Sequence, residues 1–277
     1  MKAVVEIKGG FGNQIFQYSF ANYLKTKGYR VTVNINKSNP QRFPLNSNYF
    51  GFQESSKVEV GLYKFLYFVS QKKFFNNSIN KLITKIFIKE YNLESFLKNE
   101  NRYFNHFDGY WLNVDLIKNQ KNYLIESLMK MKVVGDNLKH NIYPGKTLVH
   151  VRRGDFVDVG ENLSIKFYEE AIRYCKKRIK DFSFEVFTDD VDWVSEQKIF
   201  DKAKAIYGPT DNIDDLLIDF TKMFDFENFI IGNSTFSLIP ALLSKSKTPL
   251  IIFADPWMKN SKKYFNFEKS WIKIRNY

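Results

Sequence analysis

The sequence predicts an α/β protein built of two lobes with a cleft between them. Residues 3–35 read as strand, glycine turn, helix and strand, and a second alternating set of strands and helices runs from residue 147 to residue 253. This alternation is typical of parallel sheets covered by helices. The polar segment 136–146, with Pro144-Gly145, is expected to link the lobes. We therefore predict lobes at 1–145 and 146–277.

The first lobe opens with a short β-rich run at residues 3–7, which ends in a turn rich in glycine. Apolar residues at helical spacing then predict a helix from Asn13 to about Lys27, closed by Gly28. Residues 29–35 alternate and are rich in β-branched side chains, which predicts a strand.

Residues 57–98 are rich in lysine and aromatic residues. From Ile79 to Phe87 the apolar residues recur at helical spacing, and lysines lie off that face, which predicts a basic amphipathic helix. Such a helix either packs its apolar stripe on the lobe or attaches to an anionic membrane surface.

The second lobe follows the same logic. Strands are predicted at 147–151, 184–187, 229–231 and 249–253, and helices at 164–180, 214–226 and 237–244.

The charge of the chain is uneven. It holds 42 Lys and Arg against 30 Asp and Glu, a net charge of +12. By counting, residues 1–150 contain 22 basic and 10 acidic side chains, whereas residues 151–277 contain 20 of each. A surplus confined to one half points to a nucleic acid or membrane partner. The aromatics of 57–98 lack an RNA-recognition pattern, so a nucleic-acid partner is the weaker alternative.

Composition excludes several classes of protein. With 44% hydrophobic residues, 13 Gly and 7 Pro, the chain is neither disordered nor collagen-like. The single Cys175 excludes a disulfide framework and a cysteine-based zinc site. Charges at Glu6 and Lys8 interrupt the first apolar run, and no run of 18 apolar residues occurs. We therefore expect a cytoplasmic protein, in peripheral contact with the inner face of the cytoplasmic membrane if the basic lobe binds lipid.

Four predicted strand ends carry polar residues, and ligands of open α/β sheets bind at such ends. The first is the turn from Gly9 to Gln14, whose glycines suit an anion at a helix N-terminus. It is a poor dinucleotide motif, because Ile15 stands where the third glycine belongs and no acidic residue follows at the ribose position. A tight turn without a ligand is the alternative.

The second strand end runs from His150 to Asp155. An arginine that leaves a buried strand and is followed by glycine suits bidentate capture of a phosphate, which favours Arg152. The alternative is a structural ion pair with Asp155.

The third strand end offers three carboxylates, and the fourth offers hydroxyls. Asp190 and Asp192 have the D-x-D spacing by which many glycosyltransferases hold a divalent metal, whereas Asp189 or Asp190 could instead accept hydrogen bonds from guanine. An ordinary helix cap is the third interpretation. Residues 233–237 offer an anion nest or, again, a cap.

Together these elements resemble the α-1,2-fucosyltransferases of glycosyltransferase family 11, of the bacterial type. That family opens with a GGLGNQMFQYA-like motif, which matches residues 9–18. The H-x-R-R-G-D-Y motif matches residues 150–156, the FSDD-like element residues 187–190, and the NSTFSWW-like motif residues 233–237. A weaker GYW element matches residues 109–111.

The resemblance implies a GT-B-like fold of two Rossmann-like lobes. It implies inverting transfer of L-fucose from GDP-fucose to the 2-hydroxyl of a terminal galactose, in an oligosaccharide or O-antigen-type glycan, without a metal or cofactor. The basic lobe would face the acceptor and the second lobe would bind the donor. The implied catalytic residue is Arg152, and the implied donor-binding residues are Gly10, Gly12, Asn13, Gln14, His150, Arg153, Asp155, Asp189, Asp190, Asn233, Ser234 and Thr235.

Two departures from the family pattern affect the acceptor side. Leu238-Ile239 replaces the tryptophan pair, and Phe156 replaces the usual tyrosine. No residue identifies itself as the general base, which stays unassigned. The alternative function is another sugar-nucleotide transferase that uses a metal at Asp190 and Asp192.

Overall fold

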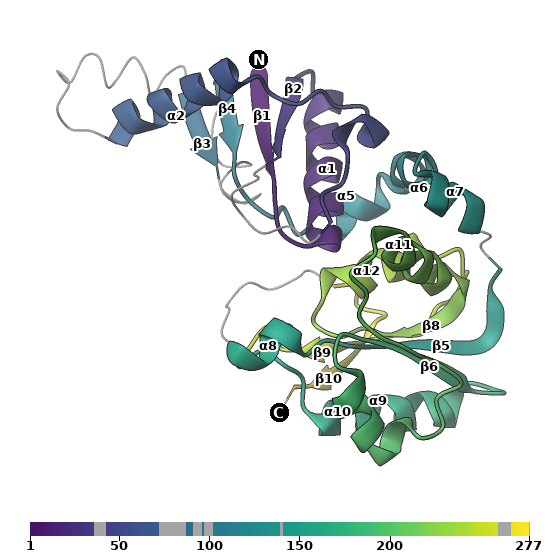
Figure 1. Ribbon diagram of the computed structural model, residues 1–277. Coiled ribbons are helices and arrows are strands. Elements are labelled where there is room, and N and C mark those ends of the chain that lie inside the picture. Colours follow the sequence, from purple (N-terminus) through teal and green to yellow (C-terminus); the bar gives the residue numbers. More distant parts are fainter. Residues whose placement is uncertain are drawn as a thin grey trace. The chain divides into compact units, whose positions relative to one another are not determined.

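The computed structural model describes residues 1–35, 43–71, 87–90, 96, 102–138, 141–259 and 267–276. The chain divides into two compact units, Met1–Ser127 and Leu128–Tyr277. Each unit contains one parallel sheet (Figure 1). The prediction of two α/β lobes is thereby confirmed.

The first unit is built on a four-stranded sheet in the order β2-β1-β4-β3. All pairings are parallel, with β1 in register with β2 from Lys2↔Arg30 to Ile7↔Ile35. The bounds are β1 Lys2–Ile7, β2 Arg30–Ile35, β3 Phe87–Glu90 and β4 Phe104–Phe107. Strand β1 lies inside the sheet and is buried from Ala3 onward, which explains its continuous apolar run.

Helices cover this sheet (Figure 1). Helix α1 (Phe11–Thr26) follows the glycine turn, as predicted, and most of its residues are buried. Helix α2 (Lys57–Gln71) packs Tyr63 and Leu66 against Val4 of β1 and Phe87 of β3. The remaining elements of this part of the chain are η1 Ser47–Phe50, α5 Val114–Lys118 and α6 Lys121–Met129.

The prediction of a basic helix from Ile79 to Phe87 is wrong at its C-terminal end. Residues 79–86 lie outside the described residues, but Phe87 and Lys89 belong to strand β3. Phe87 is buried against Tyr63 and pairs in register with Phe104 of β4. Sheet pairing and this apolar cluster therefore override the helical spacing of the sequence.

The second unit is built on a six-stranded parallel sheet in the order β10-β9-β8-β5-β6-β7. Its strands are β5 Tyr143–Val151, β6 Ser183–Thr188, β7 Ile206–Tyr207, β8 Phe226–Ile230, β9 Ile251–Asp255 and β10 Ile272–Arg275. The helices are α7 Lys132–Asn137, α8 Gly154–Asp158, α9 Ile165–Arg178, α10 Val191–Glu196, α11 Ile213–Lys222 and α12 Thr235–Leu243, with short turns η2 Lys198–Phe200 and η3 Met223–Asp225.

The segment predicted to link the lobes is structured where it is described. Residues 136 and 137 end helix α7, and Pro144-Gly145 lies inside β5, so both belong to the second unit. The strand tolerates these residues because its register with β8 shifts between Tyr143 and Thr147. Gly145 has φ +74°, and a Cβ there would lie 2.7 Å from the Asp181 carbonyl. The units divide after Ser127, earlier along the chain than the boundary at 145/146 expected from the sequence.

Within the described residues, the search for a helix of sufficient length and apolar character to cross a bilayer finds none.

Candidate functional site

Three of the four polar strand ends meet on the second sheet. Strands β8, β5 and β6 are neighbours and parallel, so their carboxyl ends lie at one edge. Arg152 follows β5, Asp189 follows β6 and Asn233 follows β8. The spacing of the motifs along the chain thus brings these residues together.

Arg152 is held by two carboxylates. Its Nη1 lies 2.8 Å from Asp189 Oδ2, and its Nη2 lies 2.6 Å from Asp155 Oδ1. The Asp155 side chain is 71% exposed, whereas that of Asp189 is 16% exposed. Because exposed ion pairs are weak and easily exchanged, Asp189 fixes the guanidinium and Asp155 contributes little. The ion pair of Arg152 with Asp155, which the sequence left as an alternative, is present. Asp189, however, is the stronger partner of Arg152.

Asp189 contacts both Arg152 and Arg153 of the arginine motif, residues 150–156. Its Oδ1 accepts a hydrogen bond from the Arg153 amide at 2.7 Å, while Oδ2 accepts from Arg152. A Cβ on Gly154 would lie 2.6 Å from Asp189 Oδ2, so glycine allows this close approach. Both oxygens therefore face the arginine motif, and Asp189 positions Arg152.

Arg153 and Asp190 form a second pair beside the first. Arg153 Nε lies 2.9 Å from Asp190 Oδ2, and its guanidinium stacks on Trp193 at 4.0 Å from the ring centroid. Asp190 Oδ1 accepts from the Trp193 amide at 3.0 Å, which caps helix α10 and, with Arg153, lowers the pKa of Asp190. The cap interpretation is confirmed for Asp190, and Asp192 is exposed in the first turn of α10.

His150 is a buried member of the site. It is 6% exposed, and burial, with a smaller effect of Arg152, lowers its pKa to about 3. The imidazole is therefore neutral at any physiological pH. Its Nδ1 has no hydrogen-bond partner among the described residues, and Gly232 packs against it, since a Cβ there would lie 3.3 Å from Nδ1.

The fourth motif forms the start of helix α12. The buried Asn233 donates from Nδ2 to the Glu161 carbonyl at 2.6 Å. Ser234 is the N-cap, with its hydroxyl accepting from the Phe236 amide at 3.3 Å, and Thr235 is the first helical residue. Ser234 and Thr235 are half-buried, and because they follow β8, the neighbour of β5, they lie at the same edge of the sheet as Arg152.

The glycine turn lies in the first unit. Gly10 is the N-cap of α1 and is exposed, while Gly12 is buried and Asn13 is half-buried. Gln14 is fully buried, and its amide bonds the carbonyls of Gly9 and Phe43 and the amide of Leu45 at 2.8–3.2 Å. The Gln14 side chain therefore holds the turn and the following loop.

Sequence reasoning missed a polar group on the first sheet. Glu6 of β1 lies 2.7 Å from His106 Nε2 of β4 and accepts from Asn34 of β2 at 2.8 Å. Asp108, the residue directly after β4, pairs with Lys8 and, at 3.2 Å, with Lys89. The available signal was the Gly109-Tyr110-Trp111 element, which begins directly after Asp108.

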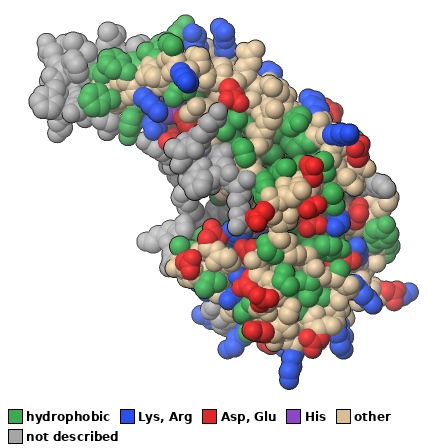
Figure 2. Space-filling model, in the orientation of Figure 1, with side chains coloured by type: hydrophobic (Ala, Val, Ile, Leu, Met, Phe, Trp, Pro, Cys, Tyr) green, Lys and Arg blue, Asp and Glu red, His purple; other side chains and the backbone are tan. Residues whose placement is uncertain are grey.

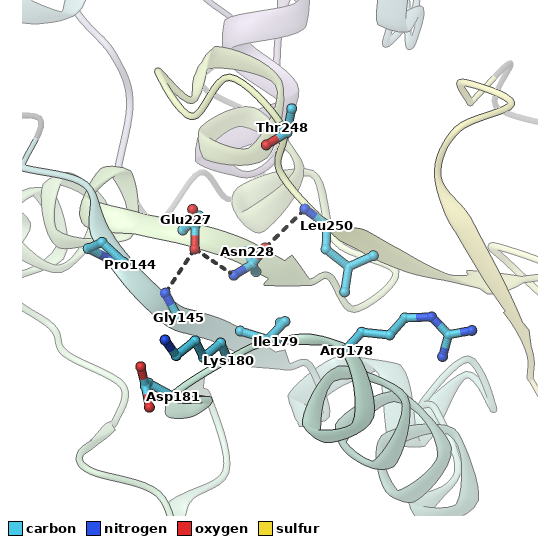
Figure 3. Close-up of a pocket in the computed structure, with 10 residues that line it drawn as sticks. All are labelled: Pro144, Gly145, Arg178, Ile179, Lys180, Asp181, Glu227, Asn228, Thr248 and Leu250. Carbon is cyan, nitrogen blue, oxygen red and sulfur yellow. Dashed lines mark hydrogen bonds between the residues drawn. The ribbon is translucent and has the colours of Figure 1, made fainter.

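A pocket of about 450 Å³ opens elsewhere on the second unit (Figure 3). It lies where β5 and β8 begin. There Glu227 of β8 accepts a hydrogen bond from the Gly145 amide of β5 at 2.8 Å. Asn228 accepts one from the Leu250 amide, just before β9, at 3.0 Å. None of the motif residues lines it. The polar groups of the pocket hold the starts of these strands together. The motifs of the second unit lie at the opposite ends of the strands.

Comparisons with known proteins identify the family of the chain. The family model described as glycosyl transferase family 11 matches residues 2–275. An α-1,2-colitosyltransferase of Escherichia coli is 28% identical, with 98% of each chain covered. The O-antigen biosynthesis glycosyltransferase WbnK of Escherichia coli is 24% identical, covering 97% of this chain and 99% of the relative.

Among solved structures, NodZ α-1,6-fucosyltransferase soaked with GDP-fucose is similar at 11% identity and a TM-score of 0.44, covering 88% of this chain and 92% of that one. The fucosyltransferase NodZ from Bradyrhizobium is similar at 13% identity and a TM-score of 0.46, covering 88% and 93%. The match of the family model over nearly the whole sequence is decisive: the chain belongs to glycosyl transferase family 11 and is a glycosyltransferase.

Proposed function

We propose that this enzyme transfers L-fucose from GDP-fucose, with inversion, to the 2-hydroxyl of a terminal galactose in an O-antigen-type glycan. The observation that carries the proposal is Arg152, a guanidinium fixed by Asp189 at the carboxyl end of β5. The relatives add support, since one is an α-1,2-colitosyltransferase and another an O-antigen glycosyltransferase.

In the proposed reaction Arg152 binds the pyrophosphate of the donor. Cleavage of the bond between fucose and phosphate builds negative charge on GDP, and a fixed guanidinium stabilises that charge most where it develops. Asp189 keeps Arg152 in place, and a phosphate oxygen replaces the exposed Asp155 at Nη2. Ser234 and Thr235, at the start of α12, add donors to the phosphates.

We propose that the reaction needs no metal. Both oxygens of Asp190 are engaged, by the Trp193 amide and by Arg153, which leaves the D-x-D pair poorly suited to a cation. Turnover of GDP-fucose should therefore continue in EDTA. Loss of activity in EDTA, restored by added Mn²⁺ or Mg²⁺, would establish the metal-dependent alternative.

The donor sugar has a second candidate. Colitose is fucose without its 3-hydroxyl, and the similarity to an α-1,2-colitosyltransferase favours testing it. The decisive experiment compares kcat/KM for GDP-fucose and GDP-colitose on a panel of β-galactosides. We expect GDP-fucose to be preferred; a clear preference for GDP-colitose would reassign the donor while leaving the 2-hydroxyl chemistry unchanged.

We also propose peripheral contact of the first unit with an anionic membrane at its cytoplasmic face. Helix α2 exposes Val58, Leu62 and Phe65 at i, i+4 and i+7, by 83%, 42% and 60%, and Lys57 and Lys64 lie close by in the sequence (Figure 2). An apolar stripe beside lysines suits an anionic lipid surface. The protein should sediment with phosphatidylglycerol vesicles at low salt, and Phe65→Ser should weaken this. Val159→Ser on the second unit, an equally exposed valine, is the control.

A further inference from the structure

The segment that follows β4 holds a strained backbone. Trp111 has φ +53°, in the left-handed region, which is unusual and strained for a bulky side chain. The Trp111 ring is 3% exposed and stacks on Phe20 of α1 at a centroid distance of 3.9 Å. Packing therefore holds this residue in a conformation that its backbone disfavours, and such strain is concentrated at functional sites.

The strained turn presents Tyr110 at the carboxyl edge of the first sheet. While Trp111 points into the core, the Tyr110 side chain is 37% exposed. Its Cε1 lies only 3.0 Å from where a Cβ on Gly9 would be, and Lys8 Nζ lies 5.5 Å from the ring centroid. An exposed aromatic ring, braced by a glycine turn, is thus fixed in orientation.

Beside this ring lies a carboxylate that is kept ionised. Asp108 precedes Gly109 and pairs with Lys8 and Lys89, which lower the pKa of Asp108 although its partial burial opposes them. The Asp108 side chain is 22% exposed. Each Asp108 oxygen is paired with a lysine, as both oxygens of the neighbouring Glu6 are paired with His106 and Asn34. Glu6, however, is buried, whereas Asp108 is partly open to solvent. Of these two carboxylates, Asp108 is therefore the one that an incoming ligand can reach.

We propose that Asp108 and Tyr110 form the subsite for the acceptor sugar, a terminal hexopyranoside. The C–H-bearing face of a pyranose packs on an aromatic ring, and an ionised carboxylate accepts a hydrogen bond from a sugar hydroxyl. The carboxyl ends of parallel strands are also where α/β sheets bind ligands. This inference rests on the proposed transferase function.

Both residues act by holding the acceptor ring. Tyr110 packs against its apolar face, and Asp108 accepts a hydrogen bond from one of its hydroxyls.

The test measures transfer from GDP-fucose to a β-galactoside in two variants. Tyr110→Ala should raise the KM of the acceptor at least about tenfold with kcat within about threefold, because it removes binding alone. Asp108→Asn removes a charge-assisted hydrogen bond to the sugar and should also raise the KM of the acceptor about tenfold, with the KM of GDP-fucose unchanged. Asp108→Glu, which keeps the carboxylate, should retain part of the acceptor affinity.

Two variants provide matched controls. Tyr103→Ala removes an exposed tyrosine just before β4, at the other end of the same strand, and Asp115→Asn neutralises an exposed aspartate in the first turn of α5. Both should behave as wild type. Far-UV circular dichroism and the melting temperature of each variant establish that it folds.

An unchanged acceptor KM in folded Tyr110→Ala or in folded Asp108→Asn would overturn the subsite while leaving the proposed function intact. If the wild-type enzyme transfers no fucose to any galactoside, the proposed function fails instead. Saturation-transfer NMR with lactose then tests the subsite without turnover: a signal that is lost in Tyr110→Ala and kept in Tyr103→Ala supports it, and a signal kept in both overturns it.

Discussion

Replacing Asp189 by asparagine tests how the arginine motif is organised. The substitution keeps the shape of the side chain and leaves one oxygen to accept from the Arg153 amide at 2.7 Å. The amide nitrogen then faces Arg152 Nη1, which lies 2.8 Å from Oδ2 in the wild type. A donor facing a donor replaces a charge-assisted hydrogen bond, so Arg152 loses its anchor while the backbone contact survives.

The expected magnitude follows from the exposure of the pair. A hydrogen bond to a charged group contributes about 1.5–3 kcal/mol. The side chains of Asp189 and Arg152 are 16% and 32% exposed, and solvent screening of such a pair reduces the loss to about 1–2 kcal/mol. If the loss is felt in the transition state, kcat/KM falls about 5- to 30-fold, since each 1.4 kcal/mol is a factor of about ten.

The assay is steady-state transfer at saturating acceptor, with urea unfolding to follow stability. Asp219→Asn, which breaks a half-exposed i,i+3 pair with Lys222 at 2.9 Å on helix α11, is the control and should change neither quantity by more than about 0.5 kcal/mol. Wild-type kcat/KM in Asp189→Asn would refute the positioning role. If the variant instead loses its discrimination between GDP and ADP as competitive inhibitors at unchanged stability, Asp189 contacts guanine, as the family resemblance implies.

Three further predictions concern the same site. Arg152→Ala should lower kcat by about 10²- to 10³-fold, roughly 3–4 kcal/mol, with an unchanged circular dichroism spectrum, and wild-type activity would exclude the phosphate role. Gly154→Ala places a methyl group 2.6 Å from Asp189 Oδ2 and should lower kcat/KM as Asp189→Asn does, whereas Gly61→Ala, in open space on α2, should stabilise the protein by about 0.5–1 kcal/mol. His150 stays neutral when folded, with a pKa of about 3, but takes up a proton near pH 6.5 when unfolded. The free energy of unfolding should therefore fall by about 1.4 kcal/mol per pH unit as pH drops below 6.5, and urea titrations of His150→Asn should lack this slope.

The sequence predicted elements with clear periodicity. Strand 3–7 corresponds to β1 and helix 13–27 to α1, within two residues at each end. Strand β4 escaped because its four residues include buried Asn105 and His106, which do not read as a sheet interior. The buried His106 forms a hydrogen bond with Glu6 on strand β1, far away in the sequence. The local sequence around β4 therefore does not show that its polar residues can be buried in a sheet.

The site shows the same limit. Interpreting each motif as a strand end correctly placed Arg152 after β5 and Asp189 after β6, at the edge where parallel sheets bind ligands. It did not show that the two side chains pair, since that depends on β5 and β6 being neighbours in the sheet. Nor did it show that Gln14 is used up inside its own turn, which depends on the contacts with Phe43 and Leu45.

The net charge of +12 and the anion site have separate physical origins, and salt should separate their effects. Around Arg152 two guanidinium groups face three carboxylates, so the site attracts phosphate through oriented donors rather than through excess charge. The surplus of lysines lies instead in the first 150 residues.

Exposed charges are screened beyond about 8–10 Å at physiological salt, whereas partly buried pairs are screened much less. Raising the salt concentration to about 0.5 M should therefore release the protein from phosphatidylglycerol vesicles while changing the KM of GDP-fucose by less than about threefold. A KM that rises in parallel with vesicle release would mean that the donor site depends on the field of the lysines.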